Sequence, residues 1–337
     1  MLRVLGFYRH AWPVQRGGSE VAAHRVLSWL ADRGHDVSAV VTHQRGIPTD
    51  GVNYLYGNRR AVMNAWSQAD VVLTHQAASG EAVELSEQYG VPVLHWSHNW
   101  QWFDAWRDRL RPGRDVVAWN SYTLAAHESQ WKGRSIVLRP PVFPERYQRS
   151  TGDRVTQVNL NRLKGGELFW NVAAELPDMR FMAVVGGWME QLDRSGQAHH
   201  PKHAVQPLAA TAPKHVQILG TTEDMESDVW PQTRVLIVPT GRVNDRQTGE
   251  SWGLVAAEAT CCGIPVVATR SPGMEELLDG TGILLDDPDD VGAWVEAIRE
   301  ADTHHDVYAD DALDRALDLD PTDELIRLED TLLEMAG

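Results

Sequence analysis

Short apolar runs, separated by enough chain for a helix, recur along the first 140 residues. The first run is Leu2–Tyr8, and a polar loop through Gly17-Gly18 follows it. A helical pattern with apolar residues at four-residue spacing comes next: Ala22, Val26 and Leu30. Further β-branched runs are candidate strands: Val37–Thr42, Asp70–Leu73, Val91–Leu94, Asp115–Trp119 and Ser135–Leu138. Strands that alternate with helices predict a parallel sheet.

Three prolines in five residues interrupt this pattern at Arg139–Pro144. Such a segment suits neither a helix interior nor a central strand, because proline lacks the amide donor that both need. We therefore expect a domain linker here. A second series of strand-like runs follows it: Val155–Leu160, Arg180–Val185, His215–Leu219, Arg234–Val238 and Ile264–Thr269.

The two series predict two Rossmann-like, doubly wound α/β domains, with residues 1–143 in the first and residues 144–320 in the second. Because ligands of such sheets bind at the carboxyl ends of the strands, we expect the domains to face a central cleft. Residues 321–337 are predicted to form a last helix that could cross back to the first domain. Its apolar residues share one face: Leu325, Leu328, Leu332 and Met335.

The composition is ordinary for a soluble protein and sufficient for two domains, with 337 residues, 43% hydrophobic and 23% charged. No stretch reaches the ~20 apolar residues of a membrane span, and a charge interrupts the N-terminus before a signal-like run can form. The two cysteines, Cys261 and Cys262, are adjacent, so they cannot supply a disulfide framework or most of a zinc site. We expect a cytoplasmic protein with no integral membrane segment and with both cysteines as small buried side chains.

The net charge of −16 is concentrated in the C-terminal tail. Residues 275–337 hold 21 Asp and Glu against three Arg, whereas the other 274 residues carry 28 basic and 26 acidic side chains. We interpret the tail as a set of solvated helix faces. Because the rest of the chain is nearly neutral, the net charge does not exclude DNA as a partner.

Two glutamates eight residues apart, Glu250 and Glu258, mark the most informative stretch of the sequence. A helix beginning near Ser251 would present unpaired backbone N–H groups and a positive dipole end, which suit a phosphate. Gly253 would allow a ligand to approach closely. Glu258 would then lie about two turns into the helix, and the carboxylates could bind separate hydroxyl-bearing parts of one ligand. On spacing alone, an exposed helix that carries two acids fits equally well.

Four landmarks, in this order, resemble the retaining glycosyltransferases of the large group-1 family (family 4), which have the GT-B fold. Gly17–Glu20 is similar to the glycine loop of that family, and Pro92–Asn99 to its strand that delivers an active-site histidine. Val158–Gly166 resembles its Lys-Gly motif, and residues 249–276 resemble its donor-binding signature. The resemblance covers nearly the whole chain.

The resemblance implies three catalytic residues, His98, Lys164 and Glu250. Glu250 would contact hydroxyls of the transferred sugar, His98 would hydrogen-bond near it, and Lys164 would neutralise the departing phosphates. A fixed cation and aimed N–H donors stabilise the charge that develops as the diphosphate leaves. These residues also have structural interpretations. Lys164 fits a solvated surface lysine, and His98 fits a histidine at a strand end whose hydrogen bonds are made within the fold.

The resemblance also implies a donor-binding set in which Glu258 would contact the ribose hydroxyls and the amides of Ser251–Leu254 the diphosphate. The full set is Gly17, Gly18, Asn159, Lys164, Gly187, Leu219, Ser251, Trp252, Gly253, Leu254 and Glu258.

One position departs from the family pattern. Many members have an arginine five residues before the lysine as a second phosphate ligand, and here that position is Asn159. Either one cation suffices, or Arg242 or Arg246 in the loop before Glu250 substitutes for it.

Four tryptophans are followed by four arginines in the half of the chain that the resemblance assigns to the acceptor: Trp96, Trp100, Trp102, Trp106, Arg107, Arg109, Arg111 and Arg114. Indole rings stack on sugars and on nucleobases, and guanidinium groups suit phosphates and carboxylates. A sugar-bearing, anionic or DNA acceptor fits this pattern. A helix that buries Trp102 and Trp106 in the core and presents the arginines on its solvent-exposed face fits the pattern as well.

The histidines of His199-His200-Pro201-Lys202-His203 lie in a long polar stretch without a carboxylate at matching spacing. We therefore expect a mobile loop there and no metal site anywhere in the chain.

These observations predict a metal-independent retaining glycosyltransferase without a cofactor. Its substrate would be a nucleotide diphosphate-sugar donor, UDP- or GDP-linked, and its acceptor a glycan, protein, small molecule or DNA. The resemblance implies front-face departure and attack, domain closure that excludes water, and no carboxylate nucleophile. The alternatives are a nucleotide-sugar epimerase, a DNA-modifying glycosyltransferase, and a catalytically silent nucleotide-sugar-binding protein. The reason for the last alternative is that Asn159 replaces the arginine of the family pattern.

Overall fold

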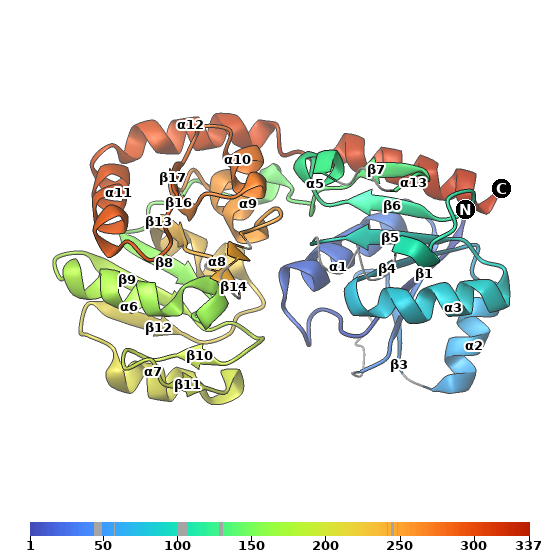
Figure 1. The fold of residues 1–337 in the computed structure, drawn as a ribbon, viewed down its shortest axis with the longest axis horizontal. Helices are drawn as coiled ribbons and strands as arrows, with labels where there is room; N and C mark the ends of the chain where they lie inside the picture. The colour runs from blue at the N-terminus through green and yellow to red at the C-terminus, as the bar shows by residue number, and fades with distance from the viewer. Residues whose placement is uncertain are drawn as a thin grey trace. The chain divides into compact units, whose positions relative to one another are not determined.

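The computed structural model describes the chain except residues 44–48, 57, 100–106, 128–130, 241, 244, 245 and 248. It also leaves out the side chains of residues 107, 242, 243, 246 and 247. The chain divides into two compact units, residues 1–141 with 321–337, and residues 142–320 (Figure 1). The division falls at Pro141–Val142, within the proline-rich segment, whereas the sequence pattern placed it after residue 143.

The first unit is built on a seven-stranded parallel sheet of order β3-β2-β1-β4-β5-β6-β7. Its strands are β1 (Arg3–Tyr8), β2 (Asp36–Val41), β3 (Asn53–Tyr56), β4 (Val71–His75), β5 (Val93–Ser97), β6 (Val116–Trp119) and β7 (Ser135–Val137). All six predicted runs are strands, and the order reverses between β1 and β4, as in a doubly wound fold. The sequence pattern missed β3, which is a short, partly exposed edge strand.

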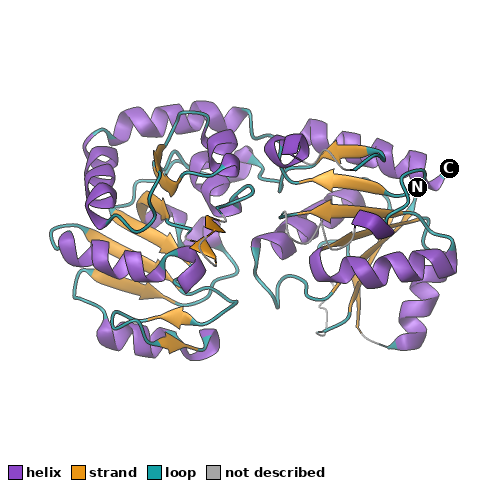
Figure 2. Ribbon diagram, viewed as in Figure 1, coloured by secondary structure: helices purple, strands orange, loops and turns teal. Residues whose placement is uncertain are grey.

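The helices of the first unit cover both faces of its sheet (Figure 2). They are α1 (Gly18–Asp32), α2 (Arg59–Gln68), α3 (Ser79–Tyr89), α5 (Tyr122–His127) and α13 (Thr322–Ala336). The predicted apolar face of α1 is confirmed, because Ala22, Val26 and Leu30 are buried. On one face of the sheet, Phe7 meets Trp66 edge to face, with ring centroids 5.5 Å apart.

Helix α13 packs against β4 and β7 of the first unit, although it follows the second unit in sequence. Three of its four predicted apolar residues are fully buried: Leu325, Leu328 and Leu332. Two buried carboxylates attach the helix. Glu324 accepts hydrogen bonds from Arg139, at 2.5 Å to Nε. Glu329 accepts from Arg33 Nη2 and interacts with His35 Nε2, each at 2.8 Å.

The second unit contains a six-stranded parallel sheet of order β12-β9-β8-β13-β16-β17. The strands are β8 (Arg154–Val158), β9 (Arg180–Val184), β12 (Val216–Leu219), β13 (Thr233–Val238), β16 (Val266–Thr269) and β17 (Ile283–Leu285). The helices of four residues or more are α6 (Gly166–Glu175), α7 (Val205–Thr211), α8 (Met225–Asp228), α9 (Leu254–Cys261), α10 (Pro272–Leu278), α11 (Val291–Thr303) and α12 (His305–Leu317). All five predicted runs of the second series are strands, and β17 was missed.

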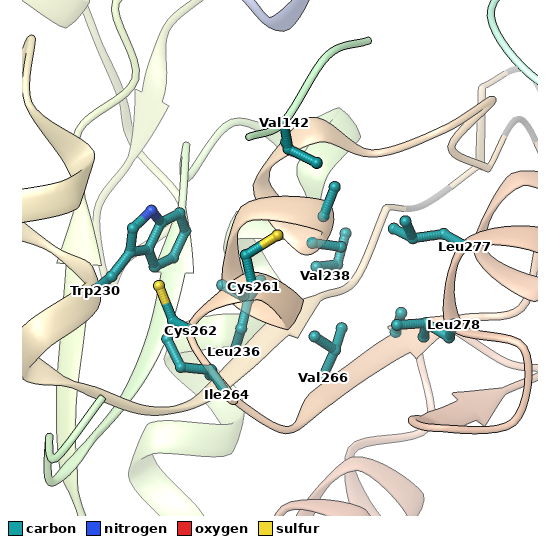
Figure 3. Packing of buried hydrophobic residues seen from close by; sticks show 14 of the residues in the cluster. Val142, Trp230, Leu236, Val238, Cys261, Cys262, Ile264, Val266, Leu277 and Leu278 are labelled. Atoms are coloured by element: carbon teal, nitrogen blue, oxygen red, sulfur yellow. The ribbon is translucent and has the colours of Figure 1, made fainter. Parts of the chain in front are cut away.

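Alternate residues of these strands enter two separate cores, as the period of two along a strand requires. Val235 and Ile237 of β13 pack with α6, α7 and α11, whereas Leu236 and Val238 pack with α9, α10 and α12. Figure 3 shows the second core, in which Trp230 lies near Cys262. Both cysteines are buried as predicted, and burial raises the pKa of Cys262.

The acidic tail forms α10 to α13, and its charges are largely exposed. Glu324 and Glu329 are exceptions, because both are buried and paired. Among the described helices, none combines the length and the apolar character needed to cross a membrane.

The attachment of α13 predicts a pH-dependent contribution to stability. Burial disfavours the charged form of Glu329, but hydrogen bonds from Arg33 and His35 outweigh it and hold its pKa below the ordinary value of 4.5. A carboxylate with a lowered pKa stabilises the fold above its ordinary pKa, and this stabilisation is lost as pH falls through the folded-state value. Glu329→Gln should therefore lower the free energy of unfolding by about 2 kcal/mol at pH 7.

The difference between the Glu329→Gln variant and the wild type should shrink as the pH falls below about 4.5, measured by thermal unfolding. Glu334 of the same helix is a matched control, because it pairs with Arg134, which precedes β7, but its side chain is 63% exposed. Glu334→Gln should change stability by at most about 0.5 kcal/mol. An equal effect of both substitutions on stability would contradict the inference that the buried Glu329 attaches α13 to the first unit.

Candidate functional site

A glycine-bounded turn precedes α9 and determines where the helix begins. Gly249 has φ +53° and Gly253 has φ +98°, both in the left-handed region. Because Gly253 is not helical, α9 starts at Leu254 and not near Ser251, which corrects the predicted start. Glu258 therefore lies about one turn into the helix instead of two.

Three side chains from neighbouring loops meet in front of this turn. Lys164, from the loop after β8, forms an ion pair with Glu250 Oε1. Thr240, which follows β13, donates a hydrogen bond to the same oxygen at 2.6 Å. Burial disfavours the charged carboxylate, but Lys164 and Thr240 outweigh it and lower the pKa of Glu250. The sequence pattern paired Lys164 with the phosphates and missed Thr240, which only the parallel pairing of β8 with β13 reveals.

Glycine is required where these loops approach one another. A Cβ atom at Gly165, which has φ +72°, would lie 2.3 Å from the carbonyl oxygen of Pro239. The glycine after Lys164 thus lets the two loops come together, which gives a physical reason for the Lys-Gly motif.

The turn that carries Glu250 is attached to the start of α10. Ser271 caps this helix and donates to the carbonyl oxygen of Glu250 at 3.1 Å, while Glu250 N lies 3.2 Å from the same hydroxyl. A Cβ at Gly273 would lie 2.4 Å from the carbonyl oxygen of Glu250. The backbone position of Glu250 is therefore fixed from both sides.

Glu258 projects from α9 and is only 4% exposed. It lies close enough to Cys262, the C-cap of the helix four residues later, to contribute to the raised pKa of that thiol. Trp252 is also buried, whereas Ser251, Gly253 and Leu254 are partly exposed. The alternative of an exposed helix that carries two acids is wrong, because the side chains of both glutamates are largely buried.

Asn159 adopts φ +72° directly after β8 and organises the loop that leads to Lys164. Its Oδ1 accepts hydrogen bonds from Gln191 at 2.7 Å and from Asn161 at 2.8 Å. Asn161 in turn accepts from the backbone N–H of Lys164 at 2.9 Å. Asn159 is thus a loop-forming residue. The side chains of Arg242 and Arg246, the predicted substitutes for a second cation, lie outside the described residues.

The remaining donor-binding candidates of this unit share one edge of the sheet. Gly187 follows β9, and Leu219 ends β12. Because β12, β9, β8 and β13 are parallel neighbours, the order brings Leu219, Gly187, Asn159 and Thr240 to the same carboxyl edge. The structure therefore brings Asn159, Lys164, Gly187, Leu219 and Glu250 together on one side of the second unit.

In the first unit, Gly17 is the N-cap of α1 and Gly18 its first residue. Ser19 donates a hydrogen bond to Glu20 Oε2 at 3.0 Å, and burial raises the pKa of this carboxyl group. A Cβ at Gly17 would lie 2.4 Å from Glu20 Oε2, so the first glycine makes room for the carboxylate.

His98 follows β5 in the first unit and lies among other aromatic rings. Its ring centroid is 4.5 Å from that of Trp96 and 5.2 Å from that of His75, at the end of β4. Asn120 holds its backbone by donating to the His98 carbonyl oxygen at 3.1 Å. Burial lowers the pKa of His98, and it lowers the pKa values of His75 and His95 to about 3. The imidazoles are therefore neutral at physiological pH, and sequence reasoning missed His75 because it ends an ordinary apolar run.

The described part of the tryptophan and arginine segment has structural roles. Trp96 is buried and donates from Nε1 to the Leu138 carbonyl oxygen at 2.9 Å. Arg109 pairs with Glu84, and Arg111 pairs with Asp115. Arg114 donates to the Ser86 carbonyl oxygen. Trp100, Trp102, Trp106 and the side chain of Arg107 lie outside the described residues.

The predicted mobile loop around His199 is instead an ordered hairpin, which corrects that expectation. Strands β10 (Gln191–Leu192) and β11 (Ala198–His199) pair antiparallel. His199 Nε2 lies 2.8 Å from Asp193 Oδ2. The sequence spacing did not identify this carboxylate as a partner of the histidines. Asp193 also accepts from Ser195 and Gln197, so a tight turn closes the hairpin. Among the residues that the structure describes, no group of three or more His, Cys, Asp or Glu could hold a metal ion.

Comparisons with known proteins agree with this geometry. Residues 159–303, which include Lys164, Glu250 and Glu258, match the family described as glycosyl transferases group 1. D-inositol 3-phosphate glycosyltransferase of Corynebacterium jeikeium is 32% identical over 155 residues, which are 41% of this chain and 32% of that protein. The protein of the same name from Mycobacterium sp. (strain KMS) is 36% identical over 141 residues, 40% of this chain and 29% of that protein. The matches thus span about a third of the length of these relatives.

Solved structures match over nearly the whole chain. HepE of Anabaena in complex with UDP-glucose gives a TM-score of 0.76 at 17% identity, covering 98% of this chain and 99% of that one. Sucrose-phosphate synthase of Thermosynechococcus elongatus gives 0.73 at 16% identity, covering 98% of both chains. The two parallel-sheet units therefore have the GT-B fold, which confirms the predicted fold class.

The hydrogen bonds of Asn159 predict that restoring an arginine at this position is harmful. Asn159→Arg would place a long side chain at φ +72° and leave Gln191 and Asn161 without their acceptor. We expect a loss of about 1–3 kcal/mol in the free energy of unfolding, measured by thermal denaturation, and no gain in anion affinity.

Asn159→Asp is the matched control, because it keeps the acceptor oxygen and tolerates the left-handed backbone. It should remain within about 1 kcal/mol of the wild type. Tighter anion binding by a fully stable Asn159→Arg variant would show that this position is a vacant phosphate subsite and not a loop anchor.

Proposed function

We propose that this chain is a group 1 glycosyltransferase and that it transfers a sugar from a nucleoside diphosphate-sugar to a hydroxyl group of an acceptor, with retention at the anomeric carbon. The observation that carries the proposal is the contact of Lys164 with Glu250 and Thr240 beside the glycine turn before α9. A cation, an anion and the start of a helix are thereby held together at the carboxyl edge of the sheet.

Each of these groups suits one part of the donor. The side chain of Lys164 is 37% exposed in the ion pair, so it remains accessible to diphosphate oxygens. The amides at the start of α9 offer further N–H donors, and the left-handed Gly253 has no side chain to block them. Glu250, kept ionised by Lys164, can accept hydrogen bonds from sugar hydroxyls.

Glu258 would bind the ribose of the donor. Its carboxylate can accept from two neighbouring hydroxyls, and burial makes such bonds stronger than they are in water. The structurally similar HepE of Anabaena is in complex with UDP-glucose, which supports a nucleoside diphosphate-sugar as the donor class.

In the proposed reaction the bond between the anomeric carbon and the diphosphate oxygen breaks, and the acceptor oxygen bonds to that carbon on the same face. The acceptor proton moves to an oxygen of the departing diphosphate. Lys164 and the amides stabilise the charge on this leaving group, so no metal ion or cofactor is required. In this reaction Glu250 orients the sugar, with its Oε1 held by Lys164 and Thr240, and no carboxylate acts as a covalent nucleophile.

The acceptor could be a glycan, a protein, a small molecule or DNA. The described arginines at 109, 111 and 114 are held by contacts within the first unit, which gives no support to a DNA-binding surface there. His98 and His75 offer neutral imidazoles that suit an uncharged hydroxyl.

A thermal-shift panel tests the donor site. A ligand that binds only the folded chain raises Tm by mass action, so UDP, GDP, ADP or TDP at about 100 times its Kd should raise Tm by several degrees. Glu258→Ala should abolish the shift by removing the ribose contacts, whereas Glu296→Ala, an exposed residue of α11, should leave it intact. No shift with any nucleotide or its sugar conjugate would count against the proposed donor class.

Glu250→Ala should reduce transfer at least about 100-fold, because the lost contact acts on the reacting sugar. The measurement is product formation from the donor that stabilises the chain, with Glu296→Ala as the control and EDTA present to test metal independence. Near-normal transfer by Glu250→Ala would show that Glu250 does not orient the transferred sugar. Donor binding without transfer or donor hydrolysis would support a silent binding protein, and conversion of the free donor would support an epimerase.

A further inference from the structure

Thr240 is a buried residue beside the reacting groups, and the proposed reaction gives it no step of its own. It follows β13, is only 6% exposed, and donates its hydroxyl proton to Glu250 Oε1 at 2.6 Å. Because its side chain is covered, Thr240 does not reach a substrate as Lys164 and Glu250 can. Any effect of this threonine on the reaction must therefore act through Glu250.

The two oxygens of the Glu250 carboxylate have different surroundings. Lys164 and Thr240 both contact Oε1, whereas Oε2 has no hydrogen-bond partner among the described residues. The Glu250 side chain is 17% exposed, so a ligand can reach part of it. Two donors on one oxygen fix the rotation of the carboxylate, which leaves Oε2 to accept from a sugar hydroxyl.

The two partners of Oε1 differ in what else they bind. In the proposed reaction Lys164 also neutralises the diphosphate, whose oxygens compete with the carboxylate for the same ammonium group. The single O–H of Thr240 is already directed at Oε1 and is buried. When the diphosphate of the donor engages Lys164, Thr240 is the partner that stays with Glu250.

The two loops that meet at Glu250 are held by contacts that do not involve the Lys164 ammonium group. Thr240 comes directly after Pro239, whose ring and carbonyl oxygen lie against Gly165. Gln157 donates to the carbonyl oxygen of Lys164 at 2.6 Å and so holds the other loop. The hydroxyl of Thr240 can therefore remain at Oε1 when the ammonium group turns to another anion.

Loss of this hydrogen bond would change the charge of the site. Burial raises the pKa of Glu250, but the charge of Lys164 and hydrogen bonds from Lys164 and Thr240 outweigh burial and lower it. If the diphosphate draws the ammonium group away, the hydrogen bond from Thr240 is left to oppose burial. Without it, the carboxyl group would keep its proton to a higher pH and would offer a donor in place of an acceptor.

We infer that Thr240 is a positioning residue for sugar transfer, which holds the Glu250 carboxylate with Oε2 directed at the transferred sugar after the diphosphate has engaged Lys164. This inference rests on the proposed function, since it concerns the carboxylate that the proposal assigns to the sugar. Thr240 itself touches neither the substrate nor the reacting atoms.

The titration of the Glu250 carboxyl group tests the inference. The measurement is the NMR chemical shift of its carboxyl carbon against pH, assigned with Glu250→Gln, in the intact chain with and without saturating UDP, or GDP where UDP gives no thermal shift. Thr240→Val, which keeps the shape of the side chain without the hydroxyl, should raise the pKa of Glu250 by about 0.5–1 in the nucleotide complex. The effect should be smaller in the free chain, where Lys164 still pairs with Glu250.

Sugar transfer gives a second measurement. Thr240→Val should lower kcat about 10- to 100-fold, the factor expected for a lost hydrogen bond to a charged group, and should move the acid limb of the kcat profile to higher pH. The affinity for the nucleotide should not change, because no contact with the diphosphate is removed. Thr240→Ser, which keeps the hydroxyl, should behave as the wild type does in both measurements.

Thr260→Val is the matched control. Thr260 is also buried, but its hydroxyl donates to the Ala256 carbonyl oxygen within α9, so this substitution tests the loss of a buried hydroxyl alone. It should lower stability without changing the titration of Glu250. An unchanged titration in nucleotide-bound Thr240→Val, or an equal change in Thr260→Val, would overturn the inference.

Glu250→Ala separates this inference from the proposed function. If Glu250→Ala abolishes transfer while Thr240→Val behaves as the wild type does, the proposed function stands and the role of Thr240 fails. If Glu250→Ala transfers normally, or if no nucleotide binds the chain, the proposed function fails and the role of Thr240 fails with it.

Discussion

The ion pair between Lys164 and Glu250 depends on backbone conformations that few residues can adopt. Lys164 reaches it through a loop that leaves β8 in a left-handed conformation at Asn159 and turns again at Gly165. Glu250 reaches it from a turn bounded by two glycines with positive φ. A lysine ammonium brought into contact with a carboxylate at the edge of a sheet lowers the pKa of Glu250, which keeps this carboxylate ionised and able to accept hydrogen bonds from a polar ligand.

Buried carboxylates of this chain are paired in both units, with different consequences. Glu324 and Glu329 attach α13 to the first unit through arginine and histidine partners, and they serve the fold. Glu250 has a partner of the same kind, but it lies at the carboxyl edge of a parallel sheet, where ligands bind. A buried carboxylate paired with a cation therefore serves the fold or a ligand site according to where the topology places it.

The carboxyl edges of the two sheets have different electrostatic character in the described residues. In the second unit the edge carries Lys164 and two largely buried glutamates, which suit phosphate and hydroxyl groups. In the first unit, His75, His95 and His98 are buried and neutral, and Trp96 packs against His98. One chain thus combines an edge suited to a charged ligand with an edge suited to an uncharged one.

The sequence by itself determined the strand pattern, both sheets and most of the candidate donor site, because β-branched runs and glycine-bounded turns are local properties. It could not predict β3 and β17, which are short edge strands, or the hairpin around His199, whose partner Asp193 lies across a turn. The tertiary structure decided that α9 begins at Leu254, that Thr240 contacts Glu250, and that Asn159 anchors a loop. The contacts of Glu250 with Thr240 and with Lys164 join residues 10 and 86 positions apart, and only the pairing of parallel strands brings such residues to one edge.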